Sequence, residues 1–195
     1  MARIVSKRQI ATGKWLSLEG ISYVDHYGVA REWESASRVG GGGAVAVVAT
    51  MKPSGRLVLV RQFRPPAAGH TVEFPAGLID GKEKPGQTAL RELYEETGYS
   101  GKVLEITRPL YSSPGMTGET VHLVCIEIDE NLPENRNLKT TFDEGEHIET
   151  FLVPMDKILD FLEKACRKGD RLDAKVTSFA VGIASSGRPG VRRRK

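Results

Sequence analysis

The sequence predicts a mixed α/β fold, in which helices cover a mixed sheet, preceded by a small N-terminal β-rich segment. Short runs of β-forming residues recur along most of the chain, one strongly helical segment interrupts them near the middle, and two more follow near the end. This order of elements is typical of a sheet packed between helices. A chain of 195 residues is long enough for one substantial core, or for one domain with a small appendage.

The N-terminal part, residues 1–39, has the pattern of short strands. The turn signal DHYG at 25–28 separates two partly alternating runs and predicts a β-hairpin. The unbroken glycine run 40–43 follows and is the best candidate for a boundary within the chain. We therefore expect a β-rich segment at 1–43, a main domain at 44–186 and a basic tail at 187–195.

Strands and helices follow one another at short intervals in the main domain. The runs AVAVVATM and RLVLVRQF, joined by KPSG, predict two strands with a tight turn between them. Further strands are expected at 70–74, 102–111, 120–128 and 147–153. Helices are expected at about 87–97, at 155–168 after Pro154, and at about 173–184.

The composition is that of a soluble globular protein, with 39% hydrophobic and 27% charged residues. No stretch approaches the roughly 18 apolar residues of a membrane span, and the start MARIVSKRQI lacks the apolar core of a secretory signal. Cys125 and Cys166 are far apart and have no metal-binding pattern around them. We expect both to be reduced, buried thiols of a cytoplasmic protein.

The net charge of +3 comes from the C-terminal tail GRPGVRRRK, which holds five basic residues and no acid. Without these five charges the rest of the chain has a net charge of −2, so a nucleic-acid partner is not expected. Three interpretations of the tail stay open: a nuclear-import signal, a nonspecific contact with polyanions, or a solubilising disordered end. The first of these would add the nucleus to the expected locations.

The strongest pattern in the chain is the segment 77–99, GLIDGKEKPGQTALRELYEETGY. Its second half is rich in helix formers, with Pro85 just before them and Gly98 just after, which predicts a helix. At about 100° per residue, three glutamates of this helix, Glu92, Glu95 and Glu96, share one arc.

Like charges at these spacings repel each other, by about 0.2–0.5 kcal/mol per pair in an isolated helix. A hard divalent cation such as magnesium would turn that repulsion into coordination. The alternative interpretation is a solvated acidic face.

The spacing of Gly77, Glu83 and the run REXXEETGY from Arg91 resembles the Nudix box, the signature of hydrolases that cut nucleoside-linked diphosphates. The flank QFRPPAAGHTVEFPAGLID, and Pro114 sixteen residues after Gly98, resemble the ADP-ribose and ADP-sugar pyrophosphatase branch. GKWLSLEGISYVD and REWESASR are similar to its eukaryotic members, so the resemblance covers about 13–185. It implies a Nudix α/β/α sandwich and magnesium-dependent cleavage of ADP-ribose, or of related ADP-sugars, to AMP and a sugar phosphate.

The resemblance also implies a metal site at the box. Its ligands are Glu92, Glu96 and the backbone carbonyl of Ala76, and Glu95 faces the same site. The expected cofactor is two or three magnesium ions, with manganese as the alternative. Arg91 and Glu83 form a supporting ion pair, which Glu73 assists.

A late glutamate acts as general base or positions the attacking water, and the resemblance assigns this role to Glu146 in FDEGEHIET. Glu144 and Glu149 compete with it because they lie close in the sequence.

For the substrate, the resemblance implies a homodimer with exchanged N-terminal segments and shared active sites. Trp15 and Trp33, one from each chain, stack on adenine; the alternative is that each tryptophan packs a small β core.

Four further contacts are implied: Glu34 and Arg38 to the base and phosphate, Arg64 as a clamp on the diphosphate, and Leu78 along the ribose. Ser113 departs from the pattern, because some relatives carry an acid there that meets the terminal ribose, so the sugar preference stays open.

Two other functions are alternatives to this one. Some members of the branch remove oxidised guanine nucleoside diphosphates, and a Nudix fold can also serve as a non-catalytic ADP-ribose-binding module. The three intact glutamates Glu92, Glu95 and Glu96 argue against the non-catalytic alternative, because a binding module does not need metal ligands. RNA decapping has no support, since the body of the chain is acidic.

Overall fold

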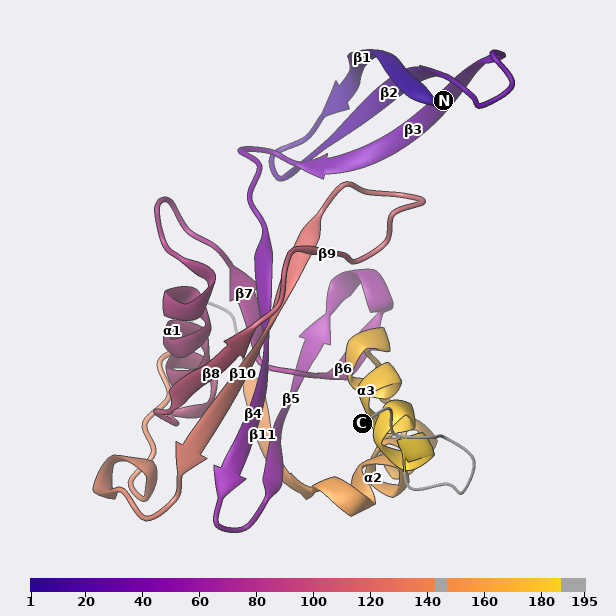
Figure 1. Ribbon diagram of the computed structural model, residues 1–195. Coiled ribbons are helices and arrows are strands. Elements are labelled where there is room, and N and C mark those ends of the chain that lie inside the picture. Colours follow the sequence, from indigo (N-terminus) through magenta and orange to yellow (C-terminus); the bar gives the residue numbers. More distant parts are fainter. Residues whose placement is uncertain (143–146, 187–195) are drawn as a thin grey trace.

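The computed structural model describes residues 1–142 and 147–186, and within them the chain forms two separate sheets (Figure 1). The smaller sheet has three strands in the order β1 (Arg3–Thr12), β2 (Leu16–Val24) and β3 (Ala30–Arg38). It stands at one end of the larger sheet, beyond the loop that follows β9. The expected N-terminal β-rich segment is therefore present.

The turn between β2 and β3 forms around Asp25. Its carboxylate accepts hydrogen bonds from the backbone N–H groups of Tyr27 and Val29, both at 2.9 Å, and Gly28 provides the positive φ of 83° that the turn needs. The two strands then pair antiparallel from Val24 to Leu16. This confirms the predicted hairpin.

The connection between the two sheets is the glycine run. Gly40, Gly41 and Gly42 have φ values of 89°, 70° and 111°. Residues with a Cβ rarely adopt these angles, so a glycine at each position lets the chain turn from β3 into β4.

The larger sheet is mixed, as expected. Its strands are β4 (Ala44–Lys52), β5 (Arg56–Arg64), β6 (Gly69–Glu73), β7 (Ala76–Leu78), β8 (Lys102–Ile106), β9 (Leu110–Tyr111), β10 (Thr120–Asp129), β11 (Ile148–Pro154) and β12 (Arg171–Leu172). The main path runs β12-β6-β5-β4-β10-β8, while β11, β7 and β9 pair with β5, β4 and β10. The pairs β10–β4 and β12–β6 are parallel, and the other pairs are antiparallel.

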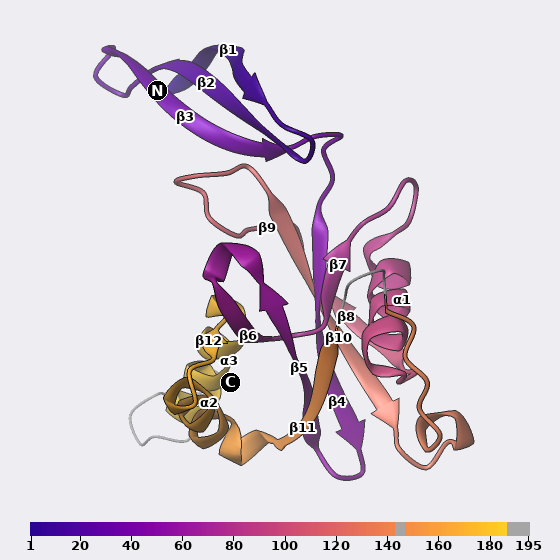
Figure 2. The same ribbon diagram turned by 180° about the vertical axis from the view of Figure 1, so that it is seen from behind.

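Helices cover both faces of this sheet, which confirms the sandwich (Figure 2). The helix α1 (Pro85–Thr97) lies on one face, and α2 (Ile158–Arg167) and α3 (Ala174–Ser186) lie on the other. Three short 3₁₀ helices complete the elements: η1 (Pro65–Ala67), η2 (Pro133–Asn135) and η3 (Met155–Lys157).

Strand β4 shows how the chain builds two cores. Val45, Val47 and Ala49 face α1 and pack with its buried residues, while the alternate residues Ala46 and Val48 face α2 and α3. Successive strand side chains point to opposite faces, so a strand buried on both sides has the continuous apolar pattern seen in AVAVVATM.

Some details differ from the expectations. The strand expected at 102–111 is interrupted at 107–109, where Pro109 removes a backbone donor, and the short strand β7 was not expected. The helix expected at 155–168 begins with the 3₁₀ turn η3.

Cys166 is exposed and Cys125 is only partly buried, so the expectation of two buried thiols was wrong. Among the described residues, no helix is both long and apolar enough to cross a membrane.

Candidate functional site

A cavity of about 690 Å³ lies at the end of the larger sheet that is nearer to the N-terminal segment. This volume is within the usual range for small-molecule sites. Most of its lining is charged or polar. Charged and polar side chains come from α1 (Arg91, Glu92, Glu95, Glu96), β5 (Gln62, Arg64), β6 (Glu73), the end of β3 (Arg38), the loop before β10 (Glu119) and α3 (Lys175).

Helix α1 carries the carboxylates, and its ends are defined by local signals. Pro85 stands in the first turn, the Gln87 side chain accepts a hydrogen bond from the Lys84 N–H, and Gly98 ends the helix in the left-handed conformation with φ of 75°. Ala89 and Leu93 are buried in the core. Their burial sets the rotation of the helix, which turns the glutamate arc toward the cavity.

Strand β7 brings backbone close to this arc. A Cβ added to Gly77 would lie 1.8 Å from Oε1 of Glu92, so only glycine leaves room for the Glu92 carboxylate. The neighbouring Ala76 N–H donates to Oε2 of Glu96 at 3.2 Å, and Glu96 is only 5% exposed. The first residues of the box therefore place the backbone beside the two glutamates expected to bind metal.

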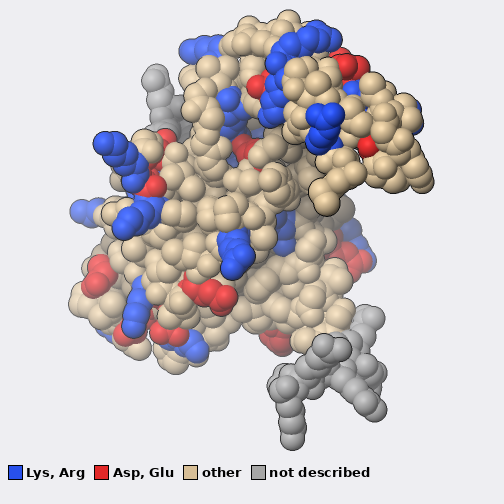
Figure 3. Space-filling model, turned by 45° about the horizontal axis from the view of Figure 1, so that its top comes forward, with Lys and Arg blue, Asp and Glu red and all other residues tan. Residues whose placement is uncertain are grey.

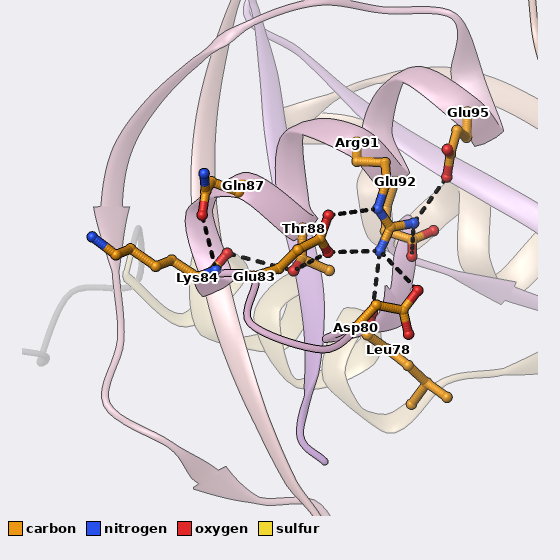
Figure 4. A network of polar contacts seen from close by, with 9 residues as sticks. All are labelled: Leu78, Asp80, Glu83, Lys84, Gln87, Thr88, Arg91, Glu92 and Glu95. Atoms are coloured by element: carbon orange, nitrogen blue, oxygen red, sulfur yellow. Dashed lines mark hydrogen bonds and ion pairs between the residues drawn. The ribbon is translucent and has the colours of Figure 1, made fainter.

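Arg91 is the centre of a carboxylate network (Figure 4). Its guanidinium binds Glu83 through two hydrogen bonds of 3.1 and 3.2 Å, so the expected ion pair is present. One terminal nitrogen also donates to Glu92 and Glu95, at 2.8 and 2.9 Å, and the other donates to the carbonyl of Leu78 at 3.3 Å. Arg91 thus joins the loop before α1 to the glutamate arc.

This network shifts the pKa values of its members. The hydrogen bonds from Arg91, followed by the one from Thr88, lower the pKa of Glu83 below its ordinary value. The carboxylates, Glu83 first, raise the pKa of Arg91. Glu83 stays ionised, and Arg91 cationic, at neutral pH.

The described residues fit a divalent cation through two of the three glutamates. Within 1–142 and 147–186, no group of three carboxylate, histidine or cysteine side chains converges as a ready metal site. Glu92 and Glu96 both line the cavity next to Ala76, and carboxylate and carbonyl oxygens are the ligands that magnesium prefers. Glu95 also lines the cavity, and Arg91 donates to one oxygen of Glu95 as it does to one oxygen of Glu92.

The cavity also contains cations that are paired with acids. Arg64 binds Glu73 through two hydrogen bonds of 2.8 and 2.9 Å, so Glu73 contacts Arg64 where we expected it to assist Arg91. Arg38 forms an ion pair with Glu119. Arg38 and Arg64 therefore both line the cavity while each is paired with an acid there.

The two tryptophans lie outside this cavity. Trp15 and Trp33 are 70% and 50% exposed, so neither packs a β core of this chain. The indole N–H of Trp33 donates to the carbonyl of Gly115 at 3.1 Å, and the ring borders a separate hollow of about 360 Å³ with Pro114.

Of the other residues predicted to contact the substrate, some line the cavity and others do not. Glu34 is exposed on β3 and does not line the cavity, whereas Leu78 does. Ser113 does not line it, but its neighbour Ser112 does.

The late glutamates are only partly described. Glu144 and Glu146 lie outside the described residues. Glu149 is on β11 and forms an ion pair of 2.6 Å with Arg61, which also binds Asp170 at 2.8 Å. Glu149 is therefore already committed to a structural contact.

Sequence reasoning missed Gln62, Glu119 and Lys175, all of which line the cavity. Gln62 carried a signal, because it is a polar residue near the end of the otherwise apolar strand run RLVLVRQF. Glu119 and Lys175 carried none, since they reach the cavity only through the packing of distant elements.

The surface seen in Figure 3 carries basic and acidic side chains close together, and this view of the described residues has no continuous basic stripe. On the N-terminal sheet, for example, Arg31 pairs with Asp25 at 3.1 Å and Lys7 with Glu19 at 3.9 Å.

Comparison with known proteins agrees with this geometry. An ADP-ribose pyrophosphatase of Saccharomyces cerevisiae is 39% identical over 193 residues, which cover 93% of this chain and 84% of that protein. An ADP-sugar pyrophosphatase of Mus musculus is 34% identical over 189 residues, covering 93% and 85%.

The crystal structure of an ADP compounds hydrolase superposes with a TM-score of 0.67 over 96% of both chains, and its 20% identity supports the fold alone. Residues 42–173 match the NUDIX domain. With the box helix, its supporting arginine and the sandwich fold in place, the chain belongs to the Nudix family.

Proposed function

We propose that this protein hydrolyses the diphosphate of ADP-ribose and related ADP-sugars to AMP and a sugar phosphate. One observation carries the proposal: a single cavity combines the metal-binding glutamates of the Nudix box with Arg64 and Arg38. A diphosphate bound between them would have metal ligands on one side and guanidinium groups on the other. The names of relatives at 34–39% identity support the same substrate class.

Nudix hydrolases generally need a divalent metal, and we propose magnesium, two or three ions per site, with manganese as a substitute. When bound, the metal neutralises the diphosphate and lowers the pKa of a bound water. Glu92, Glu96 and the Ala76 carbonyl would hold it, and Glu95 would join them. Arg64 orients the phosphates, since its planar fork matches phosphate oxygens as it now matches Glu73.

The direct test is a panel of nucleoside diphosphate sugars, assayed with magnesium and with products separated by chromatography. AMP and ribose 5-phosphate from ADP-ribose, at a higher kcat/KM than for 8-oxo-dGDP, support the proposal. A preference for the oxidised guanine nucleotide would reassign the protein to sanitising the nucleotide pool. Binding of ADP-ribose without turnover would make it a non-catalytic module.

We also propose that the active unit is a homodimer in which the N-terminal sheets complete the base sites. All ten residues of β1 are exposed, and both tryptophans stand outside the cavity of their own chain. The glycine run 40–43 supplies a joint between the sheets, and exchange of an identical element is a low-cost route to a twofold dimer. A tryptophan from each chain would then stack on adenine.

Subunit mixing tests this arrangement. Trp33→Ala is expected to raise KM for ADP-ribose, because the stacking of the base, worth about 1–3 kcal/mol of binding free energy, is lost. Metal binding should change little. Mixing this variant with an inactive Glu96→Gln chain should restore one good site per heterodimer. A monomer by light scattering at micromolar concentration, or no recovery after subunit exchange, would exclude the shared site.

The late glutamate is tested by a pair of variants. Glu146→Gln is expected to lower kcat by a factor on the order of 10²–10⁴, the range for loss of a general base, with KM nearly unchanged. Glu144→Gln should have a much smaller effect. If the two effects are reversed, the catalytic residue is Glu144. Replacing Glu149 is expected to change stability more than turnover, because its carboxylate is bound to Arg61.

A further inference from the structure

Two buried polar side chains beside the cavity have hydrogen-bonding groups that the protein does not use. Gln62 is 6% exposed and its side chain lines the cavity, where its amide is open to a ligand and makes no hydrogen bond with another residue that the structure describes. Thr71 is 8% exposed, and its hydroxyl is buried without a partner among the same residues. A hydroxyl as buried as that of Thr71 is rarely left unpaired, because its desolvation is costly.

The two residues form one cross-strand pair. Gln62 on β5 stands opposite Thr71 on β6 in an antiparallel register, so their side chains lie next to each other on one face of the sheet. Strand alternation places Arg64 and Glu73 on that same face, two residues further along each strand. The unpaired amide and hydroxyl therefore belong to the wall that carries the Arg64–Glu73 ion pair.

The register explains why the pair is buried. Arg64 stands opposite Gly69, and Glu73 stands opposite Val60. Because the two side chains meet at 2.8–2.9 Å, the line that joins them crosses the sheet over the Gln62–Thr71 pair. The ion pair shields the polar pair from bulk water, while Gln62 remains accessible from the cavity.

We propose that Gln62, backed by Thr71, binds a hydroxyl group of the sugar on the far side of the scissile diphosphate and so contributes to substrate specificity. This inference rests on the proposed function, because it places the diphosphate at Arg64. Gln62 lies two residues from Arg64 on the same strand face, about 7 Å along the strand. That distance is about the reach from a phosphate to the hydroxyls of the sugar attached to it.

The chemistry of the pair favours a hydroxyl group over the other occupants of such a cavity. An amide offers both a donor and an acceptor and carries no charge, and a threonine hydroxyl does the same. A sugar hydroxyl, which is also both donor and acceptor, can bind the Gln62 amide from the cavity, while the buried Thr71 hydroxyl lies behind that amide as its neighbour on the sheet. A phosphate is better served by Arg64 and Arg38, and an apolar group would leave the amide unpaired. A site built to hydrogen-bond a hydroxyl discriminates strongly against ligands that lack it.

The test compares two substrates in wild-type protein and in Gln62→Met, which keeps the side-chain length and removes the amide. ADP-ribose carries the far sugar, whereas the methyl ester of ADP has the same diphosphate and no sugar. The ratio of kcat/KM for ADP-ribose to that for the methyl ester should fall about tenfold in the variant, the scale of one hydrogen bond. Thermal unfolding verifies that the variant is folded.

A ratio equal to that of the wild type would overturn the proposal. If kcat/KM falls equally for both substrates, Gln62 acts on the diphosphate or on the attacking water instead. Wild-type protein that does not cleave ADP-ribose would refute the proposed function itself, and this result is seen before any variant is made.

Thr71→Val gives an independent check, since valine has the shape of threonine without the hydroxyl. The ligand-free variant should unfold at the same temperature as wild type or higher, because an unpaired buried hydroxyl is removed. Its preference for ADP-ribose over the methyl ester should nevertheless fall severalfold. A lower unfolding temperature with an unchanged preference would show that the hydroxyl has a structural role, and would overturn this part of the inference.

Discussion

Replacing Glu96 with glutamine is expected to raise the barrier to turnover by about 2–4 kcal/mol, the scale for losing one preorganised electrostatic group. Glu96 is buried at the cavity and lies against the Ala76 backbone. Glutamine keeps the shape, the helix propensity and an acceptor oxygen for the Ala76 N–H. The charge that would bind metal is removed, and a repulsion between like charges on α1 is relieved, so folding should be unchanged or slightly improved.

The measurement is kcat at saturating magnesium, together with a metal titration and thermal unfolding. Glu95→Gln is the matched control, since Glu95 lies on the same arc but is more exposed and bound to Arg91. Its effect on kcat should be smaller. Activity of Glu96→Gln within threefold of wild type would rule out the metal-binding assignment of this residue.

Replacing Gly77 with alanine is expected to have an effect of similar size although it removes no functional group. The added Cβ would lie 1.8 Å from Glu92 Oε1, a separation that atoms do not tolerate. The Glu92 carboxylate must move, and it would leave both its metal-binding position and its 2.8 Å contact with Arg91. We expect kcat to fall by about 10²–10³, as for direct loss of an electrostatic group.

Gly182→Ala is the matched control for this variant. Gly182 lies on α3, where an added Cβ meets no atom within 4 Å, and alanine should stabilise the helix by up to about 1 kcal/mol. Its activity should equal that of wild type. If Gly77→Ala keeps full activity with an intact metal titration, the close approach of β7 does not position Glu92.

The sequence by itself determined the features that depend on neighbouring residues. Proline before and glycine after a run of helix formers set the limits of α1, and the 3.6-residue period placed Glu92, Glu95 and Glu96 on one arc. The DHYG signal set the first hairpin, and the apolar run AVAVVATM set a strand buried on both faces. The box spacing was sufficient to identify the family, because its residues act within one loop and one helix.

Only the tertiary structure decided which distant residues share the cavity. Arg38 binds Glu119, Glu73 binds Arg64, and Gln62 stands opposite Thr71 on the neighbouring strand. The sequence also did not show that both tryptophans are exposed, or that Ser112 lines the cavity whereas Ser113 does not. These facts depend on how the strands of both sheets, and the loops between them, are arranged in space. The periodicity of a sequence predicts on which face of a helix or strand a side chain lies. The residue that the side chain contacts there belongs to another element, and only the packing of the elements decides which residue that is.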